Sequence, residues 1–343
     1  MRRYFCENNM SKKYEFVPGD EITIAPGRTV KRIRALVAIA TLGIVPGDLG
    51  GYVESEANLA QVSGNAWVSG DAQVSGDAWV SGNAQVYGDA WVSGNAQVYG
   101  DARVSGNAQV SGNAWVSGNA QVYGDARVSG NAQVSGNAQV YGDARVSGNA
   151  WVSGNAWVSG NAQVSGNAQV SGNAQVSGNA QVSGNAQVYG DARVSGNAQV
   201  YGNAWVSGNA WVSGNAWVSG DAQVSGDARV SGNAQVSGNA QVSGNAWVSG
   251  DAQVSGRGLI FWASIVGTEN GTLTVYNAKD DTLLVTRGCF SGTVDEFLAK
   301  SAKVHDDRIK REYQLLIEVA ASRIEAALAE TAKPEDADTA KSR

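Results

Sequence analysis

The most constraining feature of this chain is a valine that recurs every six residues from Val62 to Val254, without a miss, 33 times in all. The repeated unit is V-[SY]-G-[ND]-A-[QWR], and no insertion interrupts the array. Alanine is invariant at its position from Ala66 to Ala252. Because six residues is not a helical period, this pattern predicts a solenoid built from short strands and turns.

Each A-x-V triplet reads as a short strand whose alanine and valine point to one side and whose middle residue points to the other. The Gly-Asn or Gly-Asp pair supplies the bend, since both residue types tolerate positive φ. Three such sides close a triangle. The expected fold is therefore all-β: a single-stranded, triangular parallel β-helix of the left-handed hexapeptide type, with about 18 residues per coil and about 11 coils in a rod.

The composition agrees with a narrow interior. Between Gln61 and Gly256 there is no Leu, Ile, Phe, Met, Cys, Pro, Lys, Glu or His, and this stretch holds 33 of the 44 glycines. Small alanine and β-branched valine fill a slender triangle, whereas larger side chains would force its walls apart. Stacked corner asparagines are expected to form amide ladders along the axis, and both open ends need caps.

Four segments follow from these patterns. We expect an N-terminal β cap over residues 1–60, with 1–9 as an extension because Met10 is an alternative start. The hexapeptide-repeat β-helix covers 61–256, a C-terminal β-hairpin and helical module 257–330, and a disordered tail 331–343. In the cap, strands are predicted at Lys12–Val17 and Arg28–Ala38, with a turn at Pro18-Gly19.

The C-terminal module begins with an apolar strand over residues 259–267, followed by a hairpin turn at Asn270-Gly271. Further strands are expected at Leu273–Tyr276 and Leu283–Arg287. Thr293 and Glu296 form a capping box that starts a helix ending near Val304. A second helix has one apolar face, which is a candidate oligomerisation surface or packs on the solenoid end. That face consists of Ile309, Tyr313, Leu316, Ile317, Ala320, Ile324 and Leu328.

Three segments carry a family resemblance: the start at Lys12–Phe16, the run from Pro46 to Glu56 (PGDLGGYVESE) and the V-[SY]-G-[ND]-A-x array. Together they resemble the YdcK-like hexapeptide-repeat proteins of bacteria, phages and prophages. The run from Gly288 to Phe297 is similar to the C-terminal module of many phage members. The resemblance implies a β-helical fold and a phage or prophage origin. It implies little about activity, because most members are uncharacterised and the transferase label that some carry rests on fold analogy. It supplies no site residues.

Several classes of protein conflict with the composition. Cys6 and Cys289 are far apart and give neither a disulfide framework nor a thiolate metal site. His305 is the only histidine, so no His-rich metal centre is expected in one chain. A net charge of −6 without a basic stripe argues against nucleic acid, and the longest apolar run, 35–45, is too short for a bilayer. We expect a cytoplasmic protein without cofactor or metal.

An acyltransferase is the main enzymatic alternative, because many hexapeptide β-helices transfer acyl groups. Those enzymes resemble one another in a His general base near the β-helix surface, and this array has no His. His305 is expected to lie at a helix end. Cys289, next to Phe290, is expected to be a buried small hydrophobe and not a nucleophile.

The outward position of the unit varies, with 18 Gln, 10 Trp and 5 Arg. Outward residues 18 apart form three columns. The tryptophans occupy all three, with four, four and two members, which indicates scatter. Arginine is absent from the first column, that of Trp79, Trp115, Trp151 and Trp205. Two interpretations stay open: neutral drift among codons one base apart, or a surface selected for binding carbohydrate or a partner. The candidate surface consists of Trp67, Trp79, Trp91, Trp115, Trp151, Trp157, Trp205, Trp211, Trp217 and Trp247.

The function favoured by these observations is a non-enzymatic structural or protein-interaction rod whose terminal modules carry the specific contacts. The expected partner is a protein of unknown identity or a second copy of the chain, with no nucleic acid or membrane. Alternatives are an acyltransferase-like enzyme, a binding surface made of the exposed tryptophans, and a filament that assembles through open solenoid ends.

Overall fold

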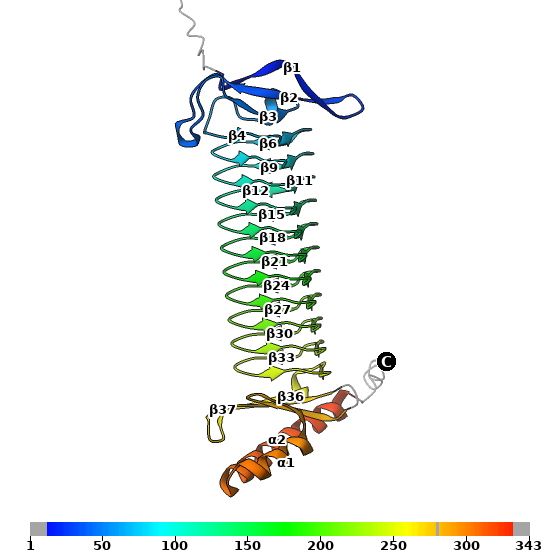
Figure 1. Cartoon of the computed structure of the whole chain (residues 1–343). Coiled ribbons are helices and arrows are strands. Elements are labelled where there is room, and N and C mark those ends of the chain that lie inside the picture. Colours follow the sequence, from blue (N-terminus) through cyan, green and yellow to red (C-terminus); the bar gives the residue numbers. More distant parts are fainter. Residues whose placement is uncertain (1–11, 279–280, 332–343) are drawn as a thin grey trace, which may run out of the picture. The chain divides into compact units, whose positions relative to one another are not determined.

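A computed structural model describes residues 12–278 and 281–331 of the chain (Figure 1). The chain divides into two compact units, Met1–Asn167 and Ala168–Arg343, and each contains a stretch of β-solenoid. In both units every array strand pairs with the strand 18 residues away, in parallel and in register. The predicted β-solenoid with 18 residues per turn is therefore confirmed, and the whole array corresponds to about 11 coils.

The first unit begins with a cap of three strands and two short 3-10 helices. The elements are β1 (Tyr14–Ala25), β2 (Arg28–Ala35), η1 (Ala40–Leu42), β3 (Leu49–Val53) and η2 (Glu56–Asn58). β1, β2 and β3 pair antiparallel in that order, while β3 pairs in parallel with an array strand. The cap thus converts an antiparallel meander into the parallel stacking of the coils.

The predicted turn at Pro18-Gly19 is wrong. β1 continues through these two residues, with a register shift between Phe16 and Glu21, and Gly19 has a φ of 79°. The chain reverses instead at Pro26-Gly27, where Gly27 has a φ of 74°. A proline–glycine pair supports either a bulge inside a strand or a tight turn, because both require a residue at positive φ.

The array strands of the first unit contain two residues each. They are β4 (Trp67–Val68), β5 (Gln73–Val74), β6 (Trp79–Val80), β7 (Gln85–Val86), β8 (Trp91–Val92), β9 (Gln97–Val98), β10 (Arg103–Val104), β11 (Gln109–Val110), β12 (Trp115–Val116), β13 (Gln121–Val122), β14 (Arg127–Val128), β15 (Gln133–Val134), β16 (Gln139–Val140), β17 (Arg145–Val146), β18 (Trp151–Val152), β19 (Trp157–Val158) and β20 (Gln163–Val164).

These strands form three sheets, one for each side of the coil. One sheet continues from the cap in the order β3-β5-β8-β11-β14-β17-β20, the second runs β4-β7-β10-β13-β16-β19, and the third runs β6-β9-β12-β15-β18. Because every third strand belongs to the same sheet, residues 18 apart lie on adjacent rungs. The three columns predicted from the spacing are confirmed within this unit.

The interior of the solenoid is closed by the small apolar residues of the repeat. The alanine and valine of every array strand from Ala66 to Val254 are completely buried. The corner glycines from Gly64 to Gly250 have φ between 58° and 73°, which L-residues adopt at a cost. The corner Asn and Asp residues do not take positive φ, so glycine alone makes the bend that both were expected to share.

Amide ladders run along the corners, as expected. Asn95 donates to Asn113, Asn113 to Asn131, and Asn131 to Asn149, with N···O distances of 3.0, 2.9 and 2.9 Å. Each of these side chains is exposed, so the ladder binds successive rungs together on the outside of the coil. Aspartate stands at the acceptor end of several ladders, as Asp101 does for Asn83, because a carboxylate accepts and cannot donate onward.

The second unit contains the remaining array strands. They are β21 (Gln169–Val170), β22 (Gln175–Val176), β23 (Gln181–Val182), β24 (Gln187–Val188), β25 (Arg193–Val194), β26 (Gln199–Val200), β27 (Trp205–Val206), β28 (Trp211–Val212), β29 (Trp217–Val218), β30 (Gln223–Val224), β31 (Arg229–Val230), β32 (Gln235–Val236), β33 (Gln241–Val242), β34 (Trp247–Val248) and β35 (Gln253–Val254). Their sheets run β23-β26-β29-β32-β35, β22-β25-β28-β31-β34 and β21-β24-β27-β30-β33.

The C-terminal module follows the last coil with η3 (Arg257–Leu259), β36 (Ile260–Val266), β37 (Gly271–Asn277), β38 (Leu283–Arg287), β39 (Phe290–Thr293), α1 (Val294–Val304) and α2 (Asp307–Thr331). The four strands form one antiparallel sheet in sequence order. The hairpin, the capping box at Thr293 and Glu296 and the helix end at Val304 are confirmed. β39 is an additional strand that the sequence did not indicate.

Cys289 is not a buried hydrophobe, contrary to the prediction. It is exposed in the two-residue turn between β38 and β39, after Gly288 with a φ of 58°. Phe290 was the reason to expect burial, but in an antiparallel hairpin the turn residues leave the sheet while their neighbours enter it.

Hydroxyl groups of the C-terminal sheet cap the exposed backbone of the last coils. The backbone N–H of Trp247 donates to Thr274 Oγ1 at 3.1 Å, and the Thr286 hydroxyl donates to the Trp247 carbonyl. The Tyr276 hydroxyl accepts from Ser249 N and donates to Ser249 O, at 3.2 and 3.1 Å. These bonds satisfy strand groups that have no further coil to pair with.

Candidate interaction surfaces

The ten array tryptophans occupy all three sheets, as predicted, but they are not equally exposed. Eight of them are 41–50 % exposed. Trp67 is 3 % exposed, which corrects the expectation that it faces outward, and Trp247 is half-buried. Trp67 lies beside Leu42, Ile44 and Leu49 of the cap, which line the same hollow. Cap residues therefore cover the outer face of the first coil.

The exposed aromatics lean toward the residue 16 positions earlier, on the neighbouring coil. Trp211 donates its indole N–H to Ser195 Oγ at 3.1 Å. Tyr99, Tyr189 and Tyr201 occupy that earlier position relative to Trp115, Trp205 and Trp217, and each pair of rings packs edge to face, with centroids 6.3–6.5 Å apart. Tyr123 and Tyr141 stack in parallel at 5.0 Å. The contacts made by the tryptophans hold their indole rings against side chains of the neighbouring coil.

The predicted apolar face of α2 is largely used inside the C-terminal module. Ile309, Tyr313, Ile317, Ala320 and Ile324 are buried, and Leu316 and Leu328 are half-buried. α2 contacts η3, β36, β37 and α1. The helix thus packs on its own sheet, and this face does not remain open for a second copy of the chain.

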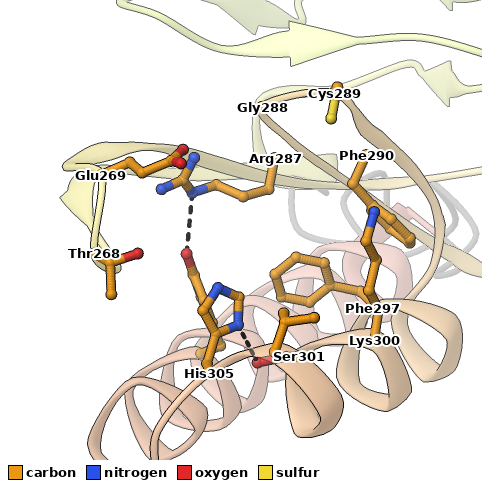
Figure 2. A pocket seen from close by; sticks show the side chains of 12 residues that line it. Thr268, Glu269, Arg287, Gly288, Cys289, Phe290, Phe297, Lys300, Ser301 and His305 are labelled. Carbon is orange, nitrogen blue, oxygen red and sulfur yellow. Dashed lines mark hydrogen bonds between the residues drawn. The ribbon is translucent and has the colours of Figure 1, made fainter.

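A cavity of about 200 Å³ lies in the C-terminal module, between the ends of the sheet and the two helices. The turn after β36 contributes Thr268 and Glu269, and α1 contributes Phe297, Lys300 and Ser301 (Figure 2). The wall is completed by Arg287, Gly288, Cys289, Phe290, Val304, His305 and Tyr313. Sequence reasoning missed this cavity because β39, which brings Phe290 to the helices, had no strand signal.

Aromatic rings form one side of the cavity. Phe297 packs against Phe290 at a centroid distance of 5.3 Å and against Tyr313 at 5.0 Å. His305 packs against Tyr313 at 5.5 Å. The Lys300 ammonium lies 5.3 Å from the Phe290 ring centroid, an arrangement in which ring and cation attract one another. The cavity therefore combines an apolar wall with an exposed positive charge.

Arg287 is fixed in place by its neighbours. Its Nε donates to the Tyr313 hydroxyl at 3.1 Å, the dashed line at Arg287 in Figure 2. Its Nη2 donates to the Val266 carbonyl at 3.0 Å. A Cβ at Gly271 would lie 2.3 Å from its Nη1, so a side chain at this position would displace the guanidinium. A guanidinium has five N–H donors, and the two bonds described leave others to face a ligand.

Ser301 and His305 form a pair at the end of α1. Ser301 Oγ lies 3.1 Å from His305 Nδ1 (Figure 2), and the His305 backbone N–H donates to the Ser301 carbonyl at 3.0 Å. His305 is the C-cap of the helix, which confirms the predicted helix-end position. Because Ser301 is 2 % exposed, its hydroxyl is directed into the protein, as in a structural pair.

Within 12–278 and 281–331, no group of three or more His, Cys, Asp or Glu side chains is placed to hold a metal ion. No helix in that part of the chain is long and apolar enough to span a membrane.

The fold defines a β-solenoid repeat protein with hexapeptide units. The sequence profile described as the YdcK beta solenoid repeat matches it in fourteen stretches. They are residues 60–76, 72–88, 96–112, 120–136, 138–154, 162–178, 168–184, 174–190, 180–196, 186–202, 198–214, 222–238, 234–250 and 240–256. The solenoid of this chain therefore belongs to the YdcK beta solenoid repeat family.

Among curated proteins, none matches this chain. Among solved structures, one similar chain is a protein from Desulfovibrio desulfuricans G20 that carries a provisional acetyltransferase assignment. It is 10 % identical, with a TM-score of 0.21, and the match covers 77 % of this chain and 81 % of that one.

Proposed function

We propose that the chain is a non-enzymatic interaction scaffold, in which the solenoid is a structural support and the C-terminal cavity makes a specific protein contact. The observation that carries this proposal is a difference between the array and the C-terminal module. In the array, the buried Ala and Val are invariant while the outward residue varies among Gln, Trp and Arg. In the module, by contrast, charged and aromatic side chains converge on one cavity.

The cavity favours a partner with an acidic or aromatic side chain. Arg287 is held in place by two hydrogen bonds, and Lys300 lies on the exposed surface of α1 beside the Phe290 ring, so the cavity carries two cations. A carboxylate would bind between them, and an aromatic ring would pack on Phe290 and Phe297. Glu269 stands on the same wall and would disfavour an acidic group on its side of the cavity.

The acyltransferase alternative lacks support in the groups that such an enzyme would use. The array carries no His, and Ser301, the one serine beside His305, is buried. A nucleophile or general base must reach the substrate. A phage or prophage origin and a cytoplasmic location, suggested by the resemblance and by the composition, complete the proposal.

The test compares two lysines on one helix. Tagged full-length protein is cross-linked in a bacterial lysate, and captured proteins are quantified by mass spectrometry. Lys300→Glu should lose the specific partner, whereas Lys303→Glu, also exposed on α1 but outside the cavity, should retain it. Equal capture by both variants would contradict the proposal, as would release of coenzyme A from acetyl-coenzyme A by the wild-type protein.

A further inference from the structure

One sheet of the first unit presents tryptophan on every second rung. Along β6-β9-β12-β15-β18 the outward residues are Trp79, Gln97, Trp115, Gln133 and Trp151, each in register with the next. Figure 1 shows these strands stacked one above the other. In the sequence the signal is a spacing of 36 residues between the tryptophans, which counting by columns alone does not reveal.

The spacing of the three indoles is set by the backbone. Adjacent strands in a sheet lie about 4.8 Å apart, so tryptophans on alternate rungs are separated by roughly 10 Å. No register shift interrupts the column. Trp79, Trp115 and Trp151 are 47, 41 and 50 % exposed, so each offers nearly half of its surface to a ligand.

Hydrogen-bonding groups lie between and beside the indoles. Gln97 and Gln133 are half-buried on the intervening rungs. The exposed amide ladder from Asn95 to Asn149 runs along the edge of the same column, two residues before each outward position from Gln97 to Trp151, and Asp77 takes this place before Trp79. An amide group has two N–H donors and two acceptor lone pairs, and the ladder uses one of each in Asn113 and Asn131. The face therefore combines apolar rings with amides in a regular pattern.

The five outward residues of this column carry no charge. No Arg is present among its five outward residues, whereas the sheet of β8 carries Arg127 and Arg145 and the sheet of β10 carries Arg103. A ligand of this face is therefore expected to be neutral, flat on one side, rich in hydroxyl groups and periodic at about two strand spacings, or roughly 10 Å.

We propose that the column Trp79-Gln97-Trp115-Gln133-Trp151 binds an extended, neutral β-1,4-linked glycan. In such a polymer each sugar is flipped relative to its neighbours, so the same face recurs once per disaccharide, at about 10 Å, the distance between alternate strands. Alternate sugars would place their C–H faces on the three indoles. The glutamine and asparagine amides would bind the hydroxyl groups of the sugars.

This site is separate from the C-terminal cavity, so the glycan proposal is tested independently of the protein contact proposed above. The probe is soluble hydroxyethyl cellulose cast into native gels, with dextran as the α-linked control. Cellohexaose and chitohexaose, titrated by tryptophan fluorescence of the full chain, then distinguish a glucan from an N-acetylated glycan. We expect retardation by the cellulose derivative, none by dextran, and saturable binding of at least one hexaose.

Three variants distinguish the effect of tryptophan position on glycan binding from the effect of tryptophan number. Trp115→Gln should weaken binding about tenfold, the scale of one lost stacking contact. Trp91→Gln removes a tryptophan of similar exposure, 46 %, from a different sheet, and should leave binding unchanged. The double variant Trp115→Gln, Gln133→Trp keeps the number of tryptophans but breaks the alternation, and it should bind as weakly as Trp115→Gln.

The variants are expected to fold, because each substitution places a residue type that the same position carries elsewhere in the array. Circular dichroism checks this for every variant. Absence of wild-type retardation together with absence of hexaose binding would overturn the proposal. It would also be overturned by equal binding of dextran, by an equal loss in Trp91→Gln, or by full binding of the double variant.

Discussion

The side-chain amide of Asn113 donates a hydrogen bond to Oδ1 of Asn131, 18 residues later, at 2.9 Å, and Asn131 passes the pattern on to Asn149 at 2.9 Å. The side chain of one corner residue therefore bonds to the rung before it and to the rung after it. This relationship explains how a coil with only two-residue strands gains cohesion: stability in a solenoid comes from contacts between neighbouring repeats, and the amide supplies one on each side.

Replacing Asn131 tests the ladder. Asn131→Ala removes both side-chain bonds, and we expect the free energy of unfolding to fall by about 1 kcal/mol, since an exposed hydrogen bond contributes near the lower end of 0.5–1.5 kcal/mol. Asn131→Asp keeps the bond from Asn113 but cannot donate to Asn149, so it should cost roughly half as much. Urea unfolding followed by circular dichroism measures both. Equal stability of all three proteins would show that the ladder is dispensable.

The corner glycines provide a second test with an internal control. Gly130 has a φ of 68°, and a Cβ there would lie 3.0 Å from the backbone N and O of Gly148. Gly250 has a φ of 72° with nothing within 4 Å of its Cβ position. Both alanine variants suffer the left-handed backbone cost of about 1–2 kcal/mol, but only Gly130→Ala also forces two coils apart.

We therefore expect Gly130→Ala to lower the unfolding midpoint in urea more than Gly250→Ala does. A larger effect at Gly250 would mean that backbone conformation, and not the close approach of neighbouring coils, explains the glycine at each corner.

Because the interior is narrow, substitutions at adjacent residues should differ sharply in their effect on stability. Ala180 is completely buried, whereas Gln181 on the next position is exposed. Ala180→Leu should destabilise the protein by about 1–3 kcal/mol through overpacking, and Gln181→Leu should change stability by less than about 0.5 kcal/mol. Thermal unfolding of the two variants compares them directly. The prediction fails if the exposed substitution is the more damaging one.

Lys13 in the N-terminal cap gives a pH-dependent prediction. It is 5 % exposed, and its Nζ has no hydrogen-bond partner among the described residues. Burial lowers its pKa from 10.5 to about 8. Between pH 8 and 10.5 the unfolded chain binds a proton that the folded chain does not, so stability rises with pH across this window, by up to ~3 kcal/mol. Below pH 8 the burial of the charged amine opposes folding fully.

Lys13→Met removes this opposition. At pH 7 the variant should be more stable than the wild type in urea, and the difference should shrink as the pH is raised toward 10.5. Lys12→Met is the control, because Lys12 is exposed and pairs with Glu56 at the surface, where an ion pair contributes about 0–1 kcal/mol. A pH-independent difference between Lys13→Met and the wild type would contradict the assignment of the buried charge.

Much of this protein could be predicted because its information is local and repeated. The Val and Ala of each hexad are buried as expected, the three columns are those given by a spacing of 18, and the capping box at Thr293 begins α1. In each case the signal lies within a few residues and recurs or has a known hydrogen-bond geometry.

The errors arise where segments distant in the sequence meet. Trp67 occupies the same position of the unit as exposed tryptophans, but Leu42, Ile44 and Leu49 from the cap lie beside it. Cys289 is exposed because β39 pairs with β38 and leaves it in the turn. Neither outcome has a signal in the neighbouring residues.

The sequence by itself determined the solenoid, because a six-residue period with glycine at each corner and only Val and Ala inside admits few other ways to bury its apolar groups. The tertiary structure decided what the chain can present to a ligand. It buried the apolar face of α2 against its own sheet and assembled Arg287, Phe290 and Lys300 around one cavity. Such surfaces form where residues distant in the sequence come together. A repeating sequence does not indicate which of its residues will be covered by the terminal modules.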